Sequence, residues 1–283
     1  MNLEIRVATL DDVKGIVDVH TAGEELSGFS VRERYLRGGP WMSVETCAVH
    51  INALLLEGQY PIVAELDGRI VGEAEVFLSE EQINGEMMRI AHLDVIEVHP
   101  DFRGKGIGRA IIEYIEGSFA GKAELLTTQP DEEAIGFYRK LGFHEVLYEN
   151  WLVEVPTAKS SGDNVRPLKF FPWEKVKGLE LVAGRFQSSY DMWFSSFKDI
   201  FAGVHELAEA GKVGNSYYVL KPLPGRPRKA SLFLWGDEKD IPGAIGRAGE
   251  IGFKSVLTVL DEKTANALST EKKGKVPIIA KRL

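Results

Sequence analysis

The alternation of apolar and polar positions predicts how the chain begins. Leu3 to Val7 alternates with the period of two that is typical of a half-buried strand. Residues 13–19 and 44–56 then place apolar side chains three and four apart, as amphipathic helices do. A threonine and two aspartates stand just before residue 13, where they favour a helix start. We therefore expect a strand and two helices, with an irregular connection over residues 24–40.

Two strands joined by a tight turn follow. Tyr60 to Leu66 and Arg69 to Leu78 are rich in apolar and β-branched residues. Asp67-Gly68 lies between them, and because both residues tolerate positive φ, the pair predicts a hairpin. A third apolar run, Ile90 to Val98, ends just before Pro100 and predicts a buried strand that stops abruptly.

Strands and helices then alternate. Residues 110–115 repeat apolar side chains with helical spacing, Ala123 to Thr128 reads as a strand, a helix surrounds Tyr138, and Phe143 to Val153 completes the set as a strand. This order predicts an α/β (α+β) fold, in which a mixed twisted sheet carries helices on both faces.

A second domain is expected after residue 157. Residues 156–164, PTAKSSGDN, contain the turn formers of a linker. The length of 283 residues also suggests two domains, at about 150 residues for each. We therefore predict one domain over residues 1–157 and a second α/β domain over 158–283. In the latter, Tyr190, Trp193, Phe194, Phe197 and Phe201 form a stripe with helical spacing that favours core packing.

Composition narrows the class of protein. Hydrophobic residues make up 44% of the chain and charged residues 27%, which is typical of a soluble globular protein. The chain has neither an apolar run of about 20 residues nor an apolar signal core, so we expect no membrane partner. The single cysteine, Cys47, excludes an internal disulfide, so the chain fits the reducing cytoplasm.

Charge is distributed unevenly along the chain. The part through Ser160 has 14 basic and 28 acidic residues, and the part from Ser161 onward has 20 and 14, which gives net charges of −14 and +6. An acidic first part could attract a cationic amine, and it argues against nucleic acid as a partner. An equally good interpretation is that both sets of charges lie on solvated faces and help the two parts dock.

The loop between the Ile90 strand and the next helix is a candidate phosphate site. Gly104, Gly106 and Gly108 occupy every second position, so backbone N–H groups can close on an anion at the positive end of the helix dipole. A dinucleotide fingerprint needs a third glycine where Arg109 stands, and a Walker loop needs Gly-Lys-Ser/Thr, which is absent here. The remaining pattern is Arg103-x-x-Gly106-x-Gly108.

This pattern resembles the pyrophosphate-binding signature of the GNAT superfamily of acetyl-CoA-dependent N-acyltransferases. A second block, Ala134 to Phe143 (AIGFYRKLGF), is similar to the Ala-x-x-Phe-Tyr-x-x-x-Gly-Phe segment that follows in that family. The resemblance covers roughly residues 1–155. It implies a GNAT-like sheet, acetyl-CoA as co-substrate and a primary amine as acceptor.

The resemblance also implies which residues hold the cofactor. It assigns the Val98 N–H to the thioester oxygen. The family commonly has Asn where Asp131 stands, and an acidic Asp131 cannot donate the same hydrogen bond. The full set of candidate cofactor-binding residues is Ile96, Val98, Arg103, Gly104, Lys105, Gly106, Ile107, Gly108, Arg109 and Asp131.

Catalysis needs a base and an acid. An alkyl ammonium must lose a proton before it attacks a thioester, and the strand offers His92, Asp94 and Glu97. Alternation puts His92 and Asp94 on one face and Glu97 on the other, unless the strand is bulged. We rank Asp94 and His92 first. The resemblance makes Tyr138 the acid that protonates the leaving thiolate, and we expect no metal.

The second part of the chain contains a trace of a repeat. Ala244 to Leu257 aligns without gaps to Ala134 to Leu147, and Leu179 to Gly203 can be threaded onto Leu93 to Gly117. In these alignments the glycine loop and the tyrosine of the first part are lost. We therefore expect a non-catalytic, degenerate GNAT-like domain over 158–283.

The functional prediction is transfer of an acetyl group from acetyl-CoA to a primary amine by direct attack in a ternary complex. The acceptor is a small molecule or a peptide, and a homodimer is one option. Two alternatives stay open. One is an acyl-CoA-binding sensor or scaffold without turnover, and the other is a protein N-terminal acetyltransferase or an O-acyltransferase.

Overall fold

The computed structural model describes residues 2–157, 165–198, 207, 209–268 and 270–283. Most of the predicted linker, and Phe201, lie outside these residues. The first part contains β1 (Leu3–Val7), α1 (Val13–Thr21), α2 (Val31–Gly38), α3 (Val44–Leu56), β2 (Tyr60–Leu66), β3 (Arg69–Ile83), β4 (Glu86–Val98), α4 (Ile107–Phe119), β5 (Leu125–Thr128), α5 (Ile135–Lys140) and β6 (Glu145–Pro156). The strands and helices predicted from periodicity are therefore confirmed, but the expectation of an irregular connection over residues 24–40 is wrong, because Val31–Gly38 form α2.

The second part repeats much of this order. It contains β7 (Val165–Leu168), β8 (Leu181–Ala183), α6 (Ser189–Phe197), β9 (Glu209–Val213), β10 (Ser216–Leu223), β11 (Arg226–Trp235), α7 (Ile241–Glu250), β12 (Ser255–Leu260), α8 (Glu262–Ala267) and β13 (Glu271–Arg282). We call residues 2–157 the N-terminal half and residues 165–283 the C-terminal half.

Local signals explain where several elements begin and turn. Asp67 and Gly68 adopt φ values of 49° and 87°, and Leu66 pairs with Arg69 on the other side of this turn. Helix α2 starts with a capping box in which the Ser30 hydroxyl accepts from the Glu33 N–H and the Glu33 carboxylate accepts from the Ser30 N–H. The hairpin prediction is confirmed.

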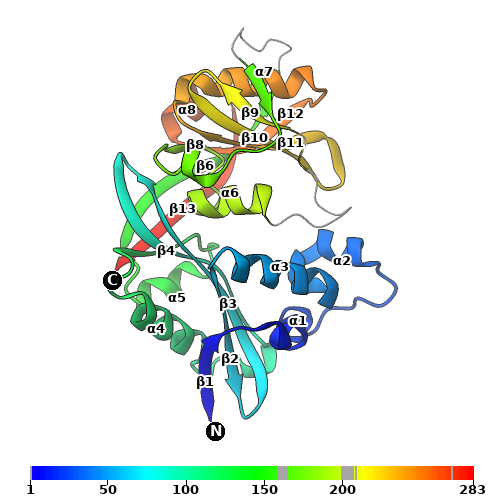
Figure 1. Ribbon diagram of the computed structural model, residues 1–283, viewed down its shortest axis with the longest axis vertical. Coiled ribbons are helices and arrows are strands. Elements are labelled where there is room, and N and C mark those ends of the chain that lie inside the picture. Colours follow the sequence, from blue (N-terminus) through cyan, green and yellow to red (C-terminus); the bar gives the residue numbers. More distant parts are fainter. Residues whose placement is uncertain (1, 158–164, 199–206, 208, 269) are drawn as a thin grey trace.

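The described strands form one sheet. Its order is β1-β2-β3-β4-β5-β13-β6-β12-β11-β10-β9-β7, with β8 attached to β11. The last strand of the chain, β13, therefore lies between β5 and β6, and β6 in turn pairs with β12. In Figure 1, β13 (red) runs beside β6 from the C-terminal half into the N-terminal half. Each half thus contributes a strand to the sheet of the other.

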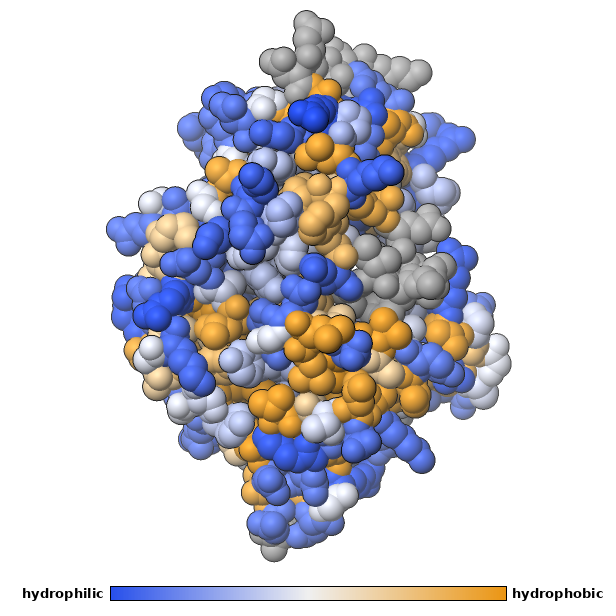
Figure 2. All heavy atoms as spheres, viewed as in Figure 1, coloured by the Kyte–Doolittle hydropathy of each residue, from blue (hydrophilic) through white to orange (hydrophobic). Residues whose placement is uncertain are grey.

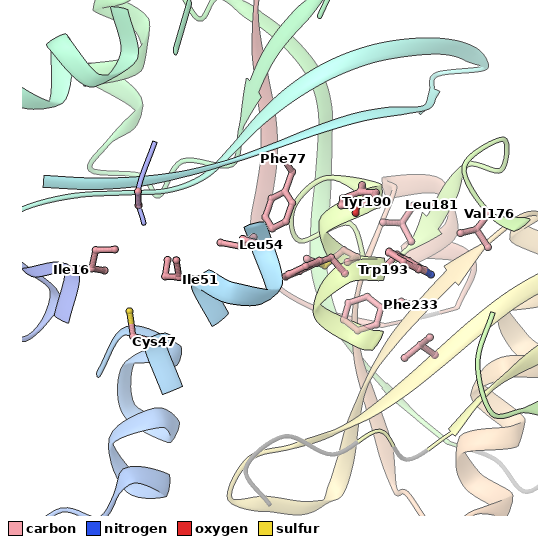
Figure 3. Close-up of a cluster of buried hydrophobic side chains, with 14 of the residues drawn as sticks. Ile16, Cys47, Ile51, Leu54, Phe77, Val176, Leu181, Tyr190, Trp193 and Phe233 are labelled. Atoms are coloured by element: carbon pink, nitrogen blue, oxygen red, sulfur yellow. The ribbon is translucent and has the colours of Figure 1, made fainter. Parts of the chain in front are cut away.

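Helices cover both faces of the sheet, as predicted. Helix α4 packs on one face of the N-terminal half through Ile111, Ile112 and Ile115. Helices α1 and α3 pack on the opposite face. Figure 3 shows that this second core continues from Ile51 and Leu54 through Phe77 to Trp193 and Phe233. Helix α6 therefore lies between the halves and shares one core with both.

The C-terminal half repeats the first, but in a different register from the one expected. Strand β12 pairs parallel with β11, as β5 pairs parallel with β4, and α7 connects β11 to β12 as α4 connects β4 to β5. The predicted alignment of Ala244–Leu257 with Ala134–Leu147 is wrong, because it matches α7 to α5. The threading of Leu179–Gly203 onto Leu93–Gly117 is also wrong, because it matches α6 to α4.

The surface is mixed. Figure 2 shows hydrophilic side chains over much of the drawn face, with apolar residues gathered in its lower middle part. Among the described residues, none of the helices combines the length and apolar character that a membrane crossing requires.

Candidate active site

The two central strands of the N-terminal half separate at one end. Strands β4 and β5 pair in parallel only from Ile90–Leu125 to Leu93–Thr128. From Asp94 onward β4 leaves its neighbour, and a cavity of about 790 Å³ opens there. The residues that line it are Asp94–Val98, Phe102–Gly104, Gly106–Arg109, Gln129–Asp131, Ala134, Phe137 and Tyr138. We call this cavity the β4–β5 groove.

The glycine loop forms the outer end of the groove. Gly104 and Gly106 have φ values of 76° and 86°, and open space surrounds the position where each Cβ would stand. Gly106 caps α4, whose first N–H groups have no partner within the helix. This arrangement fits an anion, because an approaching phosphate would meet N–H groups and the positive end of the helix. The residues present therefore fit the pyrophosphate of a coenzyme A.

Other residues predicted to bind the cofactor lie around this loop. Arg109 is an exposed residue on the first turn of α4, and Ile107 is buried. The Lys105 ammonium donates to the Asp101 carbonyl and lies 4.7 Å from the centre of the Phe102 ring. The Asp131 carboxylate accepts from the Ala134 N–H and so holds the start of the segment that leads into α5.

A polar cluster occupies the end of β4. Glu97 Oε1 accepts from the Val98 N–H at 3.2 Å and from Arg103 Nη2 at 2.6 Å, while Arg103 Nε donates to the Val98 carbonyl at 3.0 Å. The side chain of Ile96 lies on the opposite face, against the core that contains α4. An acyl oxygen that used the Val98 N–H would have to replace Glu97 there.

Tyr138 lies at the groove with its phenol protonated. It is 5% exposed and packs edge-on against Phe137 and Phe143. Burial raises its pKa to about 12, although the Thr128 side chain, to which it hydrogen-bonds, acts in the opposite direction. A neutral phenol at the wall of a groove can donate a proton to a departing anion.

Strand β4 is bulged at Asp94, which changes the predicted faces. Val95 pairs with Glu75 and Leu93 with Val76, so Asp94 has no partner on β3. The extra residue restarts the alternation, and Glu97 therefore lies on the same face as His92. The sequence placed Glu97 on the opposite face for an unbulged strand, and that placement is corrected here.

His92 is closed off from solvent. Its side chain is fully buried, Nδ1 lies 2.8 Å from the Thr127 hydroxyl, and Nε2 accepts from the Ser188 N–H at 3.3 Å. Nε2 is also 3.0 Å from Oε1 of the Gln187 amide. Burial lowers the pKa of His92 to about 4, so the ring is neutral at physiological pH. Asp94, by contrast, lines the groove.

Periodicity did not single out the buried carboxylates of β3. Glu73 and Glu75 are fully buried on the same face as His92. Glu73 lies 3.0 Å from His20 Nε2, and Glu75 accepts from the Trp41 indole at 2.7 Å and lies 2.9 Å from His50 Nε2. Burial, and then the adjacent Glu75, raise the pKa of Glu73 well above its usual range. The sequence could have indicated these buried carboxylates, because acidic residues stand at alternate positions of an otherwise apolar strand.

The corresponding space of the C-terminal half is crossed by the chain itself, although a cavity of about 820 Å³ borders the crossing strand and the ends of β11 and β12. Strand β8 pairs with the end of β11, and the Gly184 N–H donates to the Val259 carbonyl of β12 at 2.9 Å. Gly184 has φ of 86°, and a Cβ there would overlap the Leu232 carbonyl oxygen. The turn after β11 contains Asp237, Glu238 and Asp240, whose charges repel phosphate.

Comparisons with known proteins agree with this geometry. The GNAT acetyltransferase domain model matches residues 57–145. The aminoglycoside N(6')-acetyltransferase type 1 of Stenotrophomonas maltophilia is 31% identical over 117 residues, which are 39% of this chain and 76% of that protein. The peptidyl-lysine N-acetyltransferase YjaB of Escherichia coli is 38% identical over 52 residues, 18% of this chain. That match spans about a third (35%) of YjaB.

Solved structures share the fold over the whole chain. A GCN5-related N-acetyltransferase from Anabaena variabilis superposes with a TM-score of 0.68 at 13% identity, covering 99% of this chain and 72% of that one. One from Kribbella flavida has a TM-score of 0.66 at 13% identity, with coverages of 100% and 71%. Together with the domain match and the open groove beside a glycine loop, these findings show that the chain belongs to the GNAT family of acetyltransferases, which use acetyl-CoA.

Proposed function

We propose that the protein transfers the acetyl group of acetyl-CoA to a primary amine by direct attack within a ternary complex. The observation that carries this proposal is that the β4–β5 groove brings an anion-binding loop, a neutral phenol and a carboxylate together on one cavity wall. A sensor would need only the glycine loop, whereas transfer also needs the acid and the base.

Each residue has a separate task in this scheme. The glycine loop, Gly104 to Gly108, and Arg103 bind the pyrophosphate of acetyl-CoA, which supplies the acetyl thioester. The Val98 N–H, once released from Glu97, donates to the thioester oxygen as negative charge builds there. Tyr138 gives its proton to the departing sulfur. These assignments hold for any amine acceptor.

The base is Asp94 in this proposal, with Glu97 as the second candidate. Asp94 stands at the bulge and lines the groove, so it can take a proton from the amine directly or through one water. His92 is fully buried, so its part is to support the strand. The location in the cytoplasm and a homodimer stay predictions.

A turnover screen tests the proposal. Purified full-length protein is incubated with acetyl-CoA and with alkylamines, amino sugars, aminoglycosides or lysine peptides, and release of the free thiol is followed. We expect amine-dependent release that Tyr138→Phe slows, with the acetylated amine identified by mass. Tight acetyl-CoA binding without transfer to any amine would leave the sensor as the better description, and transfer to hydroxyl acceptors alone would favour the O-acyltransferase.

A further inference from the structure

A segment of the C-terminal half reaches the catalytic strand of the N-terminal half. The N–H of Ser188, the residue that caps α6, donates to His92 on β4, and Gln187 lies against the same ring nitrogen. A backbone N–H can only donate, so Nε2 must accept from Ser188, and Gln187 satisfies the same nitrogen only by turning its NH₂ toward it. Figure 1 shows α6 between the two halves.

A buried carboxylate anchors this segment. Glu81 of β3 is fully buried, and it accepts from the Ser189 N–H at 2.7 Å and from the Tyr190 N–H at 3.3 Å. The first turn of α6 therefore has a fixed position on the sheet, because the helix N-terminus favours a negative charge. Asp191, on that turn, is held in place by the same contacts.

Asp191 brings a second carboxylate to the base. The ligand atoms of His92, Asp94 and Asp191 all lie within 4.8 Å of one another. Asp94 lines the groove, whereas Asp191 is only 5% exposed and is not one of the lining residues. The two carboxylates thus lie close together beside the β4–β5 groove, one from each half of the chain.

Further acidic side chains lie on the same face of the sheet. Glu73 and Glu75 of β3 and Glu97 of β4 face the same side of the sheet, and among the described residues Oε1 of the fully buried Glu73 has no hydrogen-bond partner. From the elements packed on this face, α1 contributes His20 and α3 contributes His50. Burial lowers the pKa of His20. Several acidic side chains on one buried face disfavour a further negative charge, so the region suits a cation better than an anion.

We propose that Asp191 is a positioning residue through which the C-terminal half takes part in acceptor binding: it supports Asp94 in holding the ammonium group of a basic primary alkylamine, and it disfavours phosphorylated acceptors. The inference rests on the proposed acetyl transfer. An ammonium suits the site better than a metal ion, because both nitrogens of His92 are already engaged and offer no lone pair for a metal.

The test compares a charged with an uncharged acceptor in the full-length protein. n-Butylamine is an ammonium at neutral pH, whereas 2,2,2-trifluoroethylamine is mostly neutral there. We expect Asp191→Asn to raise KM for butylamine about 10- to 100-fold. KM for trifluoroethylamine and the Kd for acetyl-CoA should stay within about twofold of wild type. Asp191→Glu should recover most of the loss, and Asp237→Asn, at an exposed helix start, is the matched control.

Each other outcome has a definite meaning. Equal losses for both amines, or no loss, would overturn the role of Asp191 while acetyl transfer stands. Preferential turnover of a phosphorylated amino sugar by wild type would do the same. If no amine is acetylated, the proposed function itself fails. Activity that a chelator abolishes and a divalent metal restores would replace the ammonium with a metal.

A double variant guards against a folding defect. If Asp94 and Asp191 hold one ammonium together, the effects of Asp94→Asn and Asp191→Asn on kcat/KM for butylamine will be less than multiplicative. Multiplicative effects, with melting temperatures equal to wild type, would overturn the pairing. If Asp191→Asn alone fails to fold, Asp191→Ser carries the same charged-to-neutral comparison, because it also removes the carboxylate, and equal changes of KM for the two amines would overturn the role of Asp191.

Discussion

The two halves of the chain share much of their order of strands and helices, and one difference between them bears on ligand binding. In the N-terminal half the space beyond the β4–β5 pairing is open and ends at a glycine loop. In the C-terminal half the space beyond the β11–β12 pairing is crossed by β8, and the following turn is acidic. A cavity of about 820 Å³ borders β8 in the C-terminal half, but only the N-terminal groove lies between its splayed strands and ends at a glycine loop.

The halves nevertheless share one sheet. Strand β13 pairs with β5 and β6, and β6 pairs with β12, so neither half owns all the strands of its sheet. The division of the chain into domains over residues 1–157 and 158–283 stays a prediction. Because of the strand exchange, the sheet of the N-terminal half includes residues more than 140 positions away, such as Lys281, which pairs with Leu126.

The largest effect should follow removal of β13. A chain that ends at Leu268 loses the strand between β5 and β6, and so exposes the edges of both. We expect loss of cooperative unfolding and of acetyl-CoA binding, measured by circular dichroism and calorimetry. A chain that lacks only Leu283 is the control. A truncated protein that still melts cooperatively and binds acetyl-CoA would show that the halves fold independently.

Removing one hydroxyl tests the acid in the N-terminal half. Tyr138→Phe keeps the ring packing but deletes the proton donor, so kcat should fall about 10²- to 10⁴-fold with acetyl-CoA binding retained. Tyr218→Phe is the matched control, because Tyr218 is a buried tyrosine of the C-terminal half whose hydroxyl donates to Glu209. Wild-type rates for Tyr138→Phe would leave Tyr138 with a packing role.

We expect acetyl-CoA to bind only at the groove that contains the glycine loop, and not in the C-terminal half. Gly106→Val places a side chain where the phosphate approaches and should weaken binding at least about 10-fold. Gly106 has positive φ, so the variant also loses stability. Gly58→Val, at φ of 70° in open space, carries the same strain without touching the groove. Residual tight binding by Gly106→Val would point to a second site in the C-terminal half.

The smallest effect concerns the buried histidine of β4, which has no counterpart in β11. Because the pKa of His92 is about 4, the unfolded chain takes up a proton below pH 6.5 that the folded protein refuses until about pH 4. Stability should therefore fall as pH drops from about 6.5 to about 4, by at most about 1.4 kcal/mol per pH unit from this residue. Urea unfolding of wild type and His92→Gln measures the difference, and identical pH slopes would contradict it.

Local chemistry determined most of the N-terminal half. The periods of apolar residues, the Asp67-Gly68 turn and the Gly104–Gly108 loop act over a few positions, so the sequence alone predicted the elements, the sheet class and the residues around the groove. Those residues stay candidates for catalysis until they are measured. The alignment of the second half failed because shared letters such as Gly-Phe recur wherever a helix runs into a strand.

Tertiary structure decided the features that depend on contacts between distant segments of the chain. The bulge at Asp94 depends on how β4 pairs with β3, and it moves Glu97 to the face of His92. The arrival of Asp191 beside Asp94 depends on α6 packing between the halves, and the position of β13 depends on an open edge of β5. The last two contacts join residues about 100 or more positions apart, and the pairing of β4 with β3 joins residues about 20 apart. The sequence alone thus determined the groove and its loop, whereas only the packing of the two halves decided which charges face the acceptor.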